Sequence, residues 1–432
     1  MKLIHNNKLQ FSIFISFLLF SSIASFTIFK NYFLNPGCNG DEYYLENVYN
    51  LKNVTIESIT FVPSQLYLFF ASLINLFLCD SKMATRLVSF LALFFILGYF
   101  IFKIRKLNVS NVIKFQFFLI LFFVLSLTRQ PFIGSSDFLA YFFLVIFIIE
   151  LNDIFFQKIP LTGKKIFFLS LFLSMSIITR PTVLVILMVY LFCLVCFFRS
   201  KIFNFKLVFL IPIYSLLFIG LFNYGPLINN HSLVLDIKEV PKGKGTNWLE
   251  RNYLMAKFWD EGKIPQTKWL SSDEVLEYKR QNPSAYIPKS NIDLLINEPK
   301  LYIKQMIRMF FSANYTLFLY VNIFYLLAIY VVFKKYIQKK SFIDFNNSFE
   351  LINEKQIELT LVLFYLSVLF FSFLSVKLFE FRWVIPVMIV MIWNVCISLT
   401  KLRGSMIRMI LTIFYLLFTI WILKGYKLFL IN

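Results

Sequence analysis

Long apolar segments recur along the whole chain and constrain its fold more than any other feature. Segments such as 9–29, 84–102 and 309–333 reach or approach the roughly 20 residues that an α-helix needs to cross the hydrocarbon core of a bilayer. Hydrophobic residues make up 59% of the 432 positions and charged residues only 15%, whereas a soluble domain carries about 25% charged residues. The apolar runs are continuous rather than alternating, which disfavours a β-barrel. We therefore predict an all-α polytopic membrane protein.

The apolar segments divide the chain into three parts, with about 11 to 12 transmembrane helices in total. An N-terminal membrane module at 1–224 includes a first loop at about 31–62. A polar segment follows at 225–308, and C-terminal membrane helices occupy 309–432. The first span is expected to be retained, because no small-residue cleavage site follows it. The predicted spans are 9–29, 84–102, 113–127, 137–149, 166–179, 182–198, 207–224, 309–333, 357–376, 383–399 and 409–423.

The stretch 63–78, with the sequence PSQLYLFFASLINLFL, is apolar but short, and the topology depends on it. If this stretch does not cross the bilayer fully, the basic loops near 103–114, 158–165 and 334–340 all face the cytoplasm. If it does cross, several of these loops move to the outside. We therefore expect it to be re-entrant or interfacial, which gathers the first loop and the polar segment on the extracytoplasmic face. The polar segment is too short for an independent core, so we expect short helices packed on the membrane face.

The formal net charge of +20 suggests a nucleic-acid partner, but the distribution of the charge argues against one. Lys and Arg lie mainly in short loops between spans, as expected for cations beside the cytoplasmic leaflet. We expect membrane lipids as partners and no nucleic acid, and the sequence identifies no protein partner. Cys193 and Cys196 form a CxxC inside an apolar span, where they are expected to pack rather than to bind a metal.

The first loop carries an acidic pair followed directly by an aromatic pair, in the sequence NPGCNGDEYYLENVYN. A carboxylate at a membrane surface can serve as a general base, so Asp41 and Glu42 are candidate catalytic residues. Tyr43 and Tyr44 are placed to stack on a sugar ring. A structural role is the alternative, in which the acids cap an interfacial helix and the tyrosines belong to the interfacial aromatic belt.

Cations at two short connections are candidates for binding an anion. Arg180 lies with a proline between two apolar runs, so it needs access to water or an anionic partner, either a phosphate or an acidic side chain of this protein. Lys377, Glu380 and Arg382 lie within six residues in SVKLFEFRW. Two cations there suit a phosphate or diphosphate, with Arg giving bidentate contacts, although anchoring to lipid headgroups is the alternative.

Arg129 and Asp137 lie at the ends of consecutive spans, in the sequence TRQPFIGSSD. A structural ion pair between them, or snorkelling of the arginine towards the membrane surface, is the expected role. The SSD sequence also predicts an N-cap for the span that follows.

Taken in chain order, these features resemble the GT-C class of multi-spanning glycosyltransferases. Within that class the chain is similar to the protein O-mannosyltransferase and lipid A aminoarabinose transferase branch, that is, family 39-like enzymes. The first loop matches with its Asp-Glu pair and tyrosines, and the next segment matches with Pro63 and Tyr67 followed by Arg86 and Leu87. Later matching segments are SSDFLAYFF, ITRPT, INEPKLYIKQMIRMFF and KLFEFRWVIPV. The chain has no counterpart of the large C-terminal soluble domain of the aminoarabinose transferases, which leaves the acceptor open.

This resemblance implies a membrane glycosyltransferase that takes a sugar from a polyprenyl-phosphate carrier. It implies a multi-pass protein of a bacterial plasma (inner) membrane, with an extracytoplasmic active site and a lipid, glycan or protein acceptor. By position, Asp41 matches the catalytic acid of the family and Glu42 its neighbour. The expected contacts to the donor phosphate are Lys377, Arg382 and Arg180. The expected sugar or acceptor contacts are Tyr43, Tyr44 and Glu380. No cofactor is implied for certain, although some relatives use a divalent cation.

Two other functions fit a polytopic protein of this kind. A transporter or flippase for polysaccharide precursors would carry charged residues near span centres, whereas the charges here lie at span ends on one face. An O-antigen polymerase or ligase would also have many spans and a large extracytoplasmic loop, but no Asp-Glu motif is expected in its first loop. The position of this motif favours the glycosyltransferase.

Overall fold

The computed structural model describes residues 2–36, 64–106, 111–157, 159–202, 209–231, 233, 246–265, 268–321, 325–326, 328–330, 332, 348–374 and 381–400. Every regular element within these ranges is an α-helix or a 3-10 helix, which confirms the all-α prediction. Three helices in the described part of the chain are long and apolar enough to span a membrane: Ser81–Arg105, Ser136–Phe156 and Lys355–Leu374. Shorter apolar helices accompany them, and the count of about 11 to 12 spans stays a prediction.

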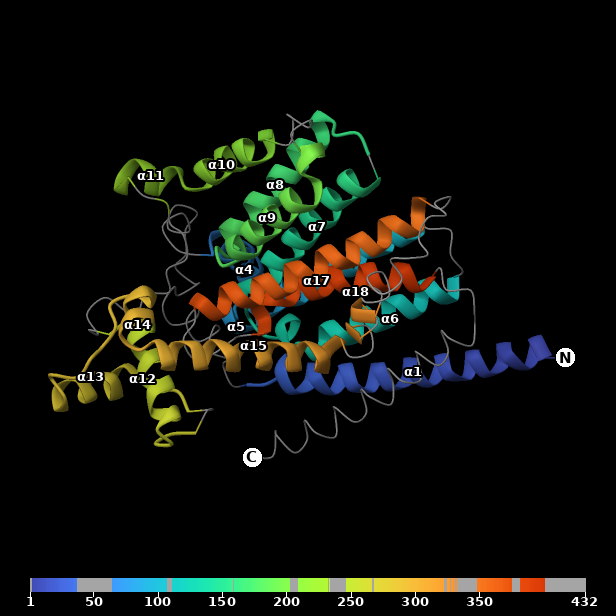
Figure 1. The fold of residues 1–432 in the computed structure, drawn as a ribbon. Coiled ribbons are helices and arrows are strands. Elements are labelled where there is room, and N and C mark those ends of the chain that lie inside the picture. Colours follow the sequence, from blue (N-terminus) through green and yellow to red (C-terminus); the bar gives the residue numbers. More distant parts are fainter. Residues whose placement is uncertain are drawn as a thin grey trace, which may run out of the picture.

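The long helices form an antiparallel bundle (Figure 1). At one end, on the left in Figure 1, α1, α6, α8 and α17 finish and α5, α7, α9 and α18 begin. We call this the site end. The bundle helices are α1 (Lys2–Tyr32), α5 (Ser81–Arg105), α6 (Asn111–Leu127), α7 (Ser136–Gln157), α8 (Gly163–Thr179), α9 (Val183–Ile202), α10 (Leu210–Phe222), α15 (Pro299–Val321), α17 (Ser348–Leu374) and α18 (Ile385–Thr400).

The helix α7 lies at the centre of the bundle, and 83% of the residues in its 18-residue apolar stretch are buried. It packs against α5, α8 and α18. Ser170 on α8 and Ser215 on α10 each donate a hydrogen bond to a backbone carbonyl of the other helix. Small side chains such as these let the two helices approach closely. Such hydroxyl bonds satisfy polar groups that would otherwise be stranded among apolar side chains.

The short helix α4 (Gln65–Leu78) both begins and ends at the site end. Ser64, which precedes it, lies with its hydroxyl 3.2 Å from that of Ser136 at the start of α7. The turn at its other end leads at once into α5, whose first helical turns contact the end of α1. Fourteen residues extend only about 21 Å, less than the roughly 30 Å of a hydrocarbon core. The helix therefore does not run the length of the bundle, and the re-entrant or interfacial position of 63–78 stays a prediction.

A small helical unit, which we call the polar unit, lies between α10 and α17 along the chain and at the left end of the bundle in Figure 1. It consists of α12 (Trp248–Asp260), α13 (Ser272–Gln281), α14 (Asn291–Asn297) and the first turns of α15. Capping boxes start α12 and α13, with the side chains of Asn247 and Ser271 each accepting a backbone hydrogen bond. Contrary to the expectation from the sequence, the unit has a small hydrophobic core of its own, because three short helices and the start of α15 bury apolar side chains against one another. This core consists of Tyr253, Leu254, Met255, Ala256, Leu270, Val275, Leu294 and Tyr302.

Two hydrogen bonds attach the polar unit to the site end of the bundle. The hydroxyl of Tyr302 donates to the carbonyl of Phe373 at 2.5 Å, and the side-chain amide of Asn291 donates to the carbonyl of Leu374 at 3.2 Å. Both acceptors belong to the last turn of α17, whose carbonyls lack partners within the helix. The polar unit is therefore fixed a few residues before the connection that leads to α18.

Candidate functional site

A buried carboxylate pairs with two arginines at the site end. Asp137, in the first turn of α7, is completely enclosed. Its Oδ1 lies 2.7 Å from Arg180 Nε, and its Oδ2 accepts a hydrogen bond of 2.9 Å from Arg382 Nη1. The side chain of Arg180 is 5% exposed and that of Arg382 is 21% exposed. Two cations around one buried carboxylate offset its loss of hydration.

Local backbone features bring these three side chains together. Arg180 is the C-cap of α8, in an extended conformation, because the proline that follows it disfavours a continued helix. Arg382 lies in a 3-10 turn, Phe381–Val384, directly before α18. Ser135 donates a hydrogen bond of 2.9 Å from its hydroxyl to Asp137 and accepts one from the backbone N–H of Asp137. The SSD sequence thus orients the carboxylate as well as starting the helix.

The partners of these residues differ in part from those expected. Asp137 pairs with Arg180 and Arg382 instead of the expected Arg129. Arg129 has a left-handed backbone conformation and lies with its guanidinium 4.8 Å from the ring centre of Tyr32. For Arg180 the sequence leaves open a phosphate or an acidic side chain, and the structure supplies the acidic side chain.

A chain of buried polar groups extends from Asp137 towards α4. The hydroxyl of Ser89 donates to the carbonyl of Ser135 at 3.0 Å. The hydroxyl of Tyr67 lies 3.2 Å from that of Ser89 and donates to the carbonyl of Thr85 at 2.7 Å. Because buried polar groups need partners, this chain fixes α4, α5 and α7 relative to one another. Tyr67 was singled out by the family resemblance, whereas no sequence signal identified Ser89.

Arg86 holds the end of α1, from which the chain enters the first loop. Its side chain is buried, and Nη1 donates to the carbonyls of Phe33 at 2.8 Å and Asn35 at 2.6 Å. One turn earlier on α5, the ammonium of Lys82 donates to the carbonyl of Pro36. The ring of Phe33 stacks on Phe29 at 4.7 Å between centroids. The chain therefore leaves α1 from a fixed position beside α5.

Several predicted site residues lie outside the part of the chain that the structure describes. These are Asp41, Glu42, Tyr43, Tyr44, Lys377 and Glu380. Of the predicted phosphate contacts, Arg180 and Arg382 are described, and the fold brings both to one carboxylate. The described residues include no group of three or more His, Cys, Asp or Glu side chains arranged to hold a metal ion.

A second charged cluster lies at the opposite end of the bundle. The ammonium of Lys103, in the last turn of α5, lies 2.6 Å from carboxylate oxygens of both Glu150 and Asp153 on α7. The hydroxyl of Tyr99 donates to Glu150 at 2.9 Å. Here two acids share one cation, the reverse of the charge balance at Asp137.

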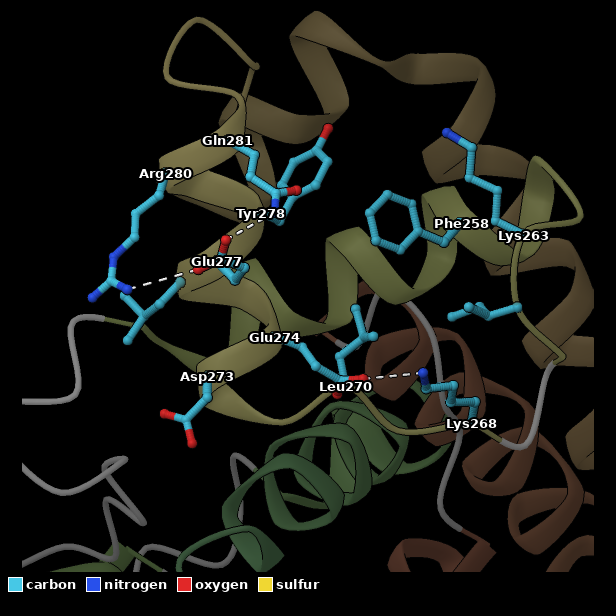
Figure 2. Close-up of a pocket in the computed structure, with 12 residues that line it drawn as sticks. Phe258, Lys263, Lys268, Leu270, Asp273, Glu274, Glu277, Tyr278, Arg280 and Gln281 are labelled. Atoms are coloured by element: carbon cyan, nitrogen blue, oxygen red, sulfur yellow. Dashed lines mark hydrogen bonds and ion pairs between the residues drawn. The ribbon is translucent and has the colours of Figure 1, made fainter.

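The polar unit contains an open pocket of about 770 Å³ between α12, α13 and the loop that joins them (Figure 2). Phe258 and Tyr278 meet edge to face at 5.1 Å on one side. The charged groups around it pair with one another, as Lys268 does with Glu274 at 3.0 Å and Arg280 does with Glu277 at 3.7 Å (Figure 2). Mutual pairing leaves little excess charge, so this pocket is a poor anion site compared with the arginines at Asp137.

Comparison of the chain with known protein families, with curated proteins and with solved structures finds no match.

Proposed function

We propose that the chain is a membrane glycosyltransferase that transfers a sugar from a polyprenyl-phosphate-linked donor to a lipid, glycan or protein acceptor. The observation that carries this proposal is the meeting of Arg180 and Arg382 on Asp137, close to the point where the chain enters the first loop. The proposed protein has about 11 to 12 spans in a bacterial plasma membrane, with the site end on the extracytoplasmic side.

The charge at the opposite end supports this orientation. Lys103, Arg105, Lys106, Lys164 and Lys165 lie at the ends of α5 and α8 that are remote from Asp137. Cations in short connections favour the cytoplasmic side. The arginines at the site end are instead buried or half-buried and engage protein acceptors, as Arg86 and Arg180 do. They do not form a basic loop of the kind that the positive-inside rule counts.

The chemistry of a polyprenyl-phosphate donor matches a cationic site at a membrane surface. Its leaving group is an anionic phosphate, which needs positive charge more than it needs a general acid. Arg382 is the more accessible of the two arginines, and a guanidinium can bind a phosphate through two parallel N–H groups. In this proposal Arg382 and Lys377 contact the donor phosphate, and Arg180 holds Asp137 in place.

The acceptor hydroxyl needs a base, and Asp41 is the proposed base with Glu42 as its neighbour. Six positions separate Asp41 from Asn35, whose carbonyl Arg86 binds. Tyr43, Tyr44 and Glu380 are the proposed contacts to the sugar or acceptor.

The distribution of buried charge disfavours transport. Among the described residues, the buried ion pairs lie near helix ends, at Asp137 in the first turn of α7 and at Lys103 in the last turn of α5. A transport pathway is expected to place charge near the middle of the spans.

The test uses the full chain reconstituted in lipid vesicles with a radiolabelled polyprenyl-phosphate sugar and an extract of membrane acceptors. The Asp41→Asn variant is expected to lose transfer by about 10² to 10⁴-fold, the usual contribution of a general base. Arg382→Gln is expected to raise KM for the donor, with Arg382→Lys giving partial recovery. Arg105→Gln, at the other end of the bundle, is the matched control and should transfer normally. Undiminished transfer by Asp41→Asn would exclude the proposed base.

A further inference from the structure

Large apolar side chains are exposed on the polar unit beside charged ones. The seven-residue helix α14 buries Leu294 in the core of the unit but leaves Ile292 and Ile296 exposed by 62% and 71%. These two isoleucines are one helical turn apart and so lie on one face. Two exposed isoleucines alone are ordinary at a protein surface, so their role depends on what lies next to them along the chain.

The next helix, α15, also exposes apolar side chains along one face. Its buried residues include Tyr302, Met309 and Ala313. Its exposed apolar residues recur every four positions and form one stripe, consisting of Ile303, Ile307, Phe311 and Tyr315. The second half of this stripe lies in the predicted span 309–333, whereas the first half precedes it.

A row of basic side chains runs beside the stripe. Lys300, Lys304 and Arg308 also recur every four positions, at the polar-unit end of α15. Asp260 pairs with Lys304 at 2.5 Å and with Arg308 at 3.1 Å. The row thus carries three cations against one carboxylate, next to apolar side chains that lead into a predicted span.

We propose that Ile292, Ile296, Ile303 and Ile307, together with the neighbouring Lys300 and Lys304, bind the surface of an anionic phospholipid bilayer. We call these six residues the docking surface. Apolar side chains beside lysines are the pattern of an interfacial helix, which inserts its apolar face between headgroups and lets ammonium groups contact lipid phosphates. Lipid is the occupant because the stripe on α15 continues into the predicted span without a break.

Membrane binding through the docking surface would fix the position of the polar unit relative to both the bundle and the bilayer. Tyr302 and Asn291 attach it to the end of α17, and the docking surface attaches it to the bilayer beside the bundle. The proposal rests on membrane insertion of α15 and not on the transfer reaction, so either proposal can fail without the other.

The test places an environment-sensitive fluorophore on the Ile296→Cys variant of the full chain, in which the native cysteines are replaced by serine. The protein is reconstituted in vesicles of phosphatidylcholine and phosphatidylglycerol with brominated acyl chains. We expect brominated lipid to quench the label and iodide to be excluded from it. A Gln281→Cys label on α13 is the matched control, for which we expect the opposite response. Adding Lys300→Gln should reduce lipid quenching in phosphatidylglycerol vesicles, whereas Arg280→Gln should leave it unchanged.

Two results would overturn the docking surface. Equal iodide quenching at positions 296 and 281 would show that the isoleucines face water. Protection of position 296 from both iodide and brominated lipid would show that another protein surface covers it. Each labelled variant should unfold at the same temperature as the unlabelled parent, which separates loss of docking from loss of fold.

Discussion

Asp137 and Arg382 are 245 positions apart in the chain, and their side chains form a hydrogen bond of 2.9 Å. The bond joins the start of α7, in the N-terminal module, to the turn before α18, near the other end of the chain. Arg180 completes the cluster from the end of α8. Three separate segments therefore depend on one carboxylate, and this dependence leads to distinct predictions for each member.

Replacing Asp137 by asparagine should destabilise the fold strongly. The change leaves two arginines without their shared anion, and breaking a buried ion pair typically costs about 3–5 kcal/mol. Denaturant unfolding in detergent micelles should show this loss. The double variant Asp137→Asn with Arg180→Gln should recover part of it, because one stranded charge is removed. If Asp137→Asn unfolds at the same denaturant concentration as the wild type, the ion pairs of Asp137 with the two arginines do not stabilise the fold.

The two arginines should differ in what they contribute. Arg180 is almost fully buried, so Arg180→Gln should lower stability more than Arg382→Gln does. Arg382 is the more exposed, so Arg382→Gln should change donor KM more than Arg180→Gln does. Measuring unfolding and donor titration on the same two preparations separates these roles. If both variants have equal effects on stability and on donor KM, the two arginines do not have these separate roles.

Removing Arg86 should loosen the end of α1. The Arg86→Ala variant loses two hydrogen bonds from a charged donor to backbone carbonyls, each worth about 1.5–3 kcal/mol. Hydrogen exchange across residues 29–36 should become faster, while the far end of α1 keeps its rate. Arg105→Ala, in the last turn of α5, is the control. If exchange near Phe33 is unchanged, other contacts hold the chain there.

The attachment of the polar unit should depend on Tyr302. Tyr302→Phe removes the hydroxyl that binds the carbonyl of Phe373, a loss of about 0.5–1.5 kcal/mol. Limited proteolysis between α14 and α15 should become faster in this variant. Tyr315→Phe, at an exposed position on the same helix, should behave like the wild type. Equal protection of both variants would show that the hydroxyl does not hold the unit.

Acid should weaken the contact between α12 and α15. A hydrogen bond from Lys304, assisted by Arg308, lowers the pKa of Asp260 below its ordinary value of 3.8. A carboxyl whose pKa is lowered by folding stabilises the fold above its unfolded pKa and stops doing so as pH falls through its folded pKa. Local opening at the end of α12, measured as the hydrogen-exchange rate divided by the intrinsic amide exchange rate at each pH, should therefore be constant from about pH 7 to 5 and rise below about pH 4. The Asp260→Asn variant should lack this rise, and a rise of equal size in that variant would assign the effect to another group.

The sequence by itself determined the helical secondary structure, and it predicts a membrane protein. Continuous apolar runs dictate helices, since a chain in hydrocarbon must satisfy its backbone groups within each helix. The short length of 63–78 and the positions of the basic loops led to the prediction that this stretch does not cross the bilayer fully. The fold places both ends of α4 near one end of the bundle, and the topology itself stays a prediction. The proline after Arg180 and the SSD sequence at the start of α7 likewise marked real helix ends.

Only the tertiary structure decided which charges meet. Arg129 is the nearest arginine to Asp137 in sequence, yet Asp137 pairs with Arg180 and with the distant Arg382. Local sequence cannot show this, because ion-pair partners at helix ends depend on how the helices pack and in which order they lie. The hydroxyl chain through Ser89 and Tyr67 has the same origin, since serine and tyrosine are common in apolar helices and become a network only where three helices converge. Helix formation depends on neighbours along the chain, whereas this cluster depends on neighbours in space.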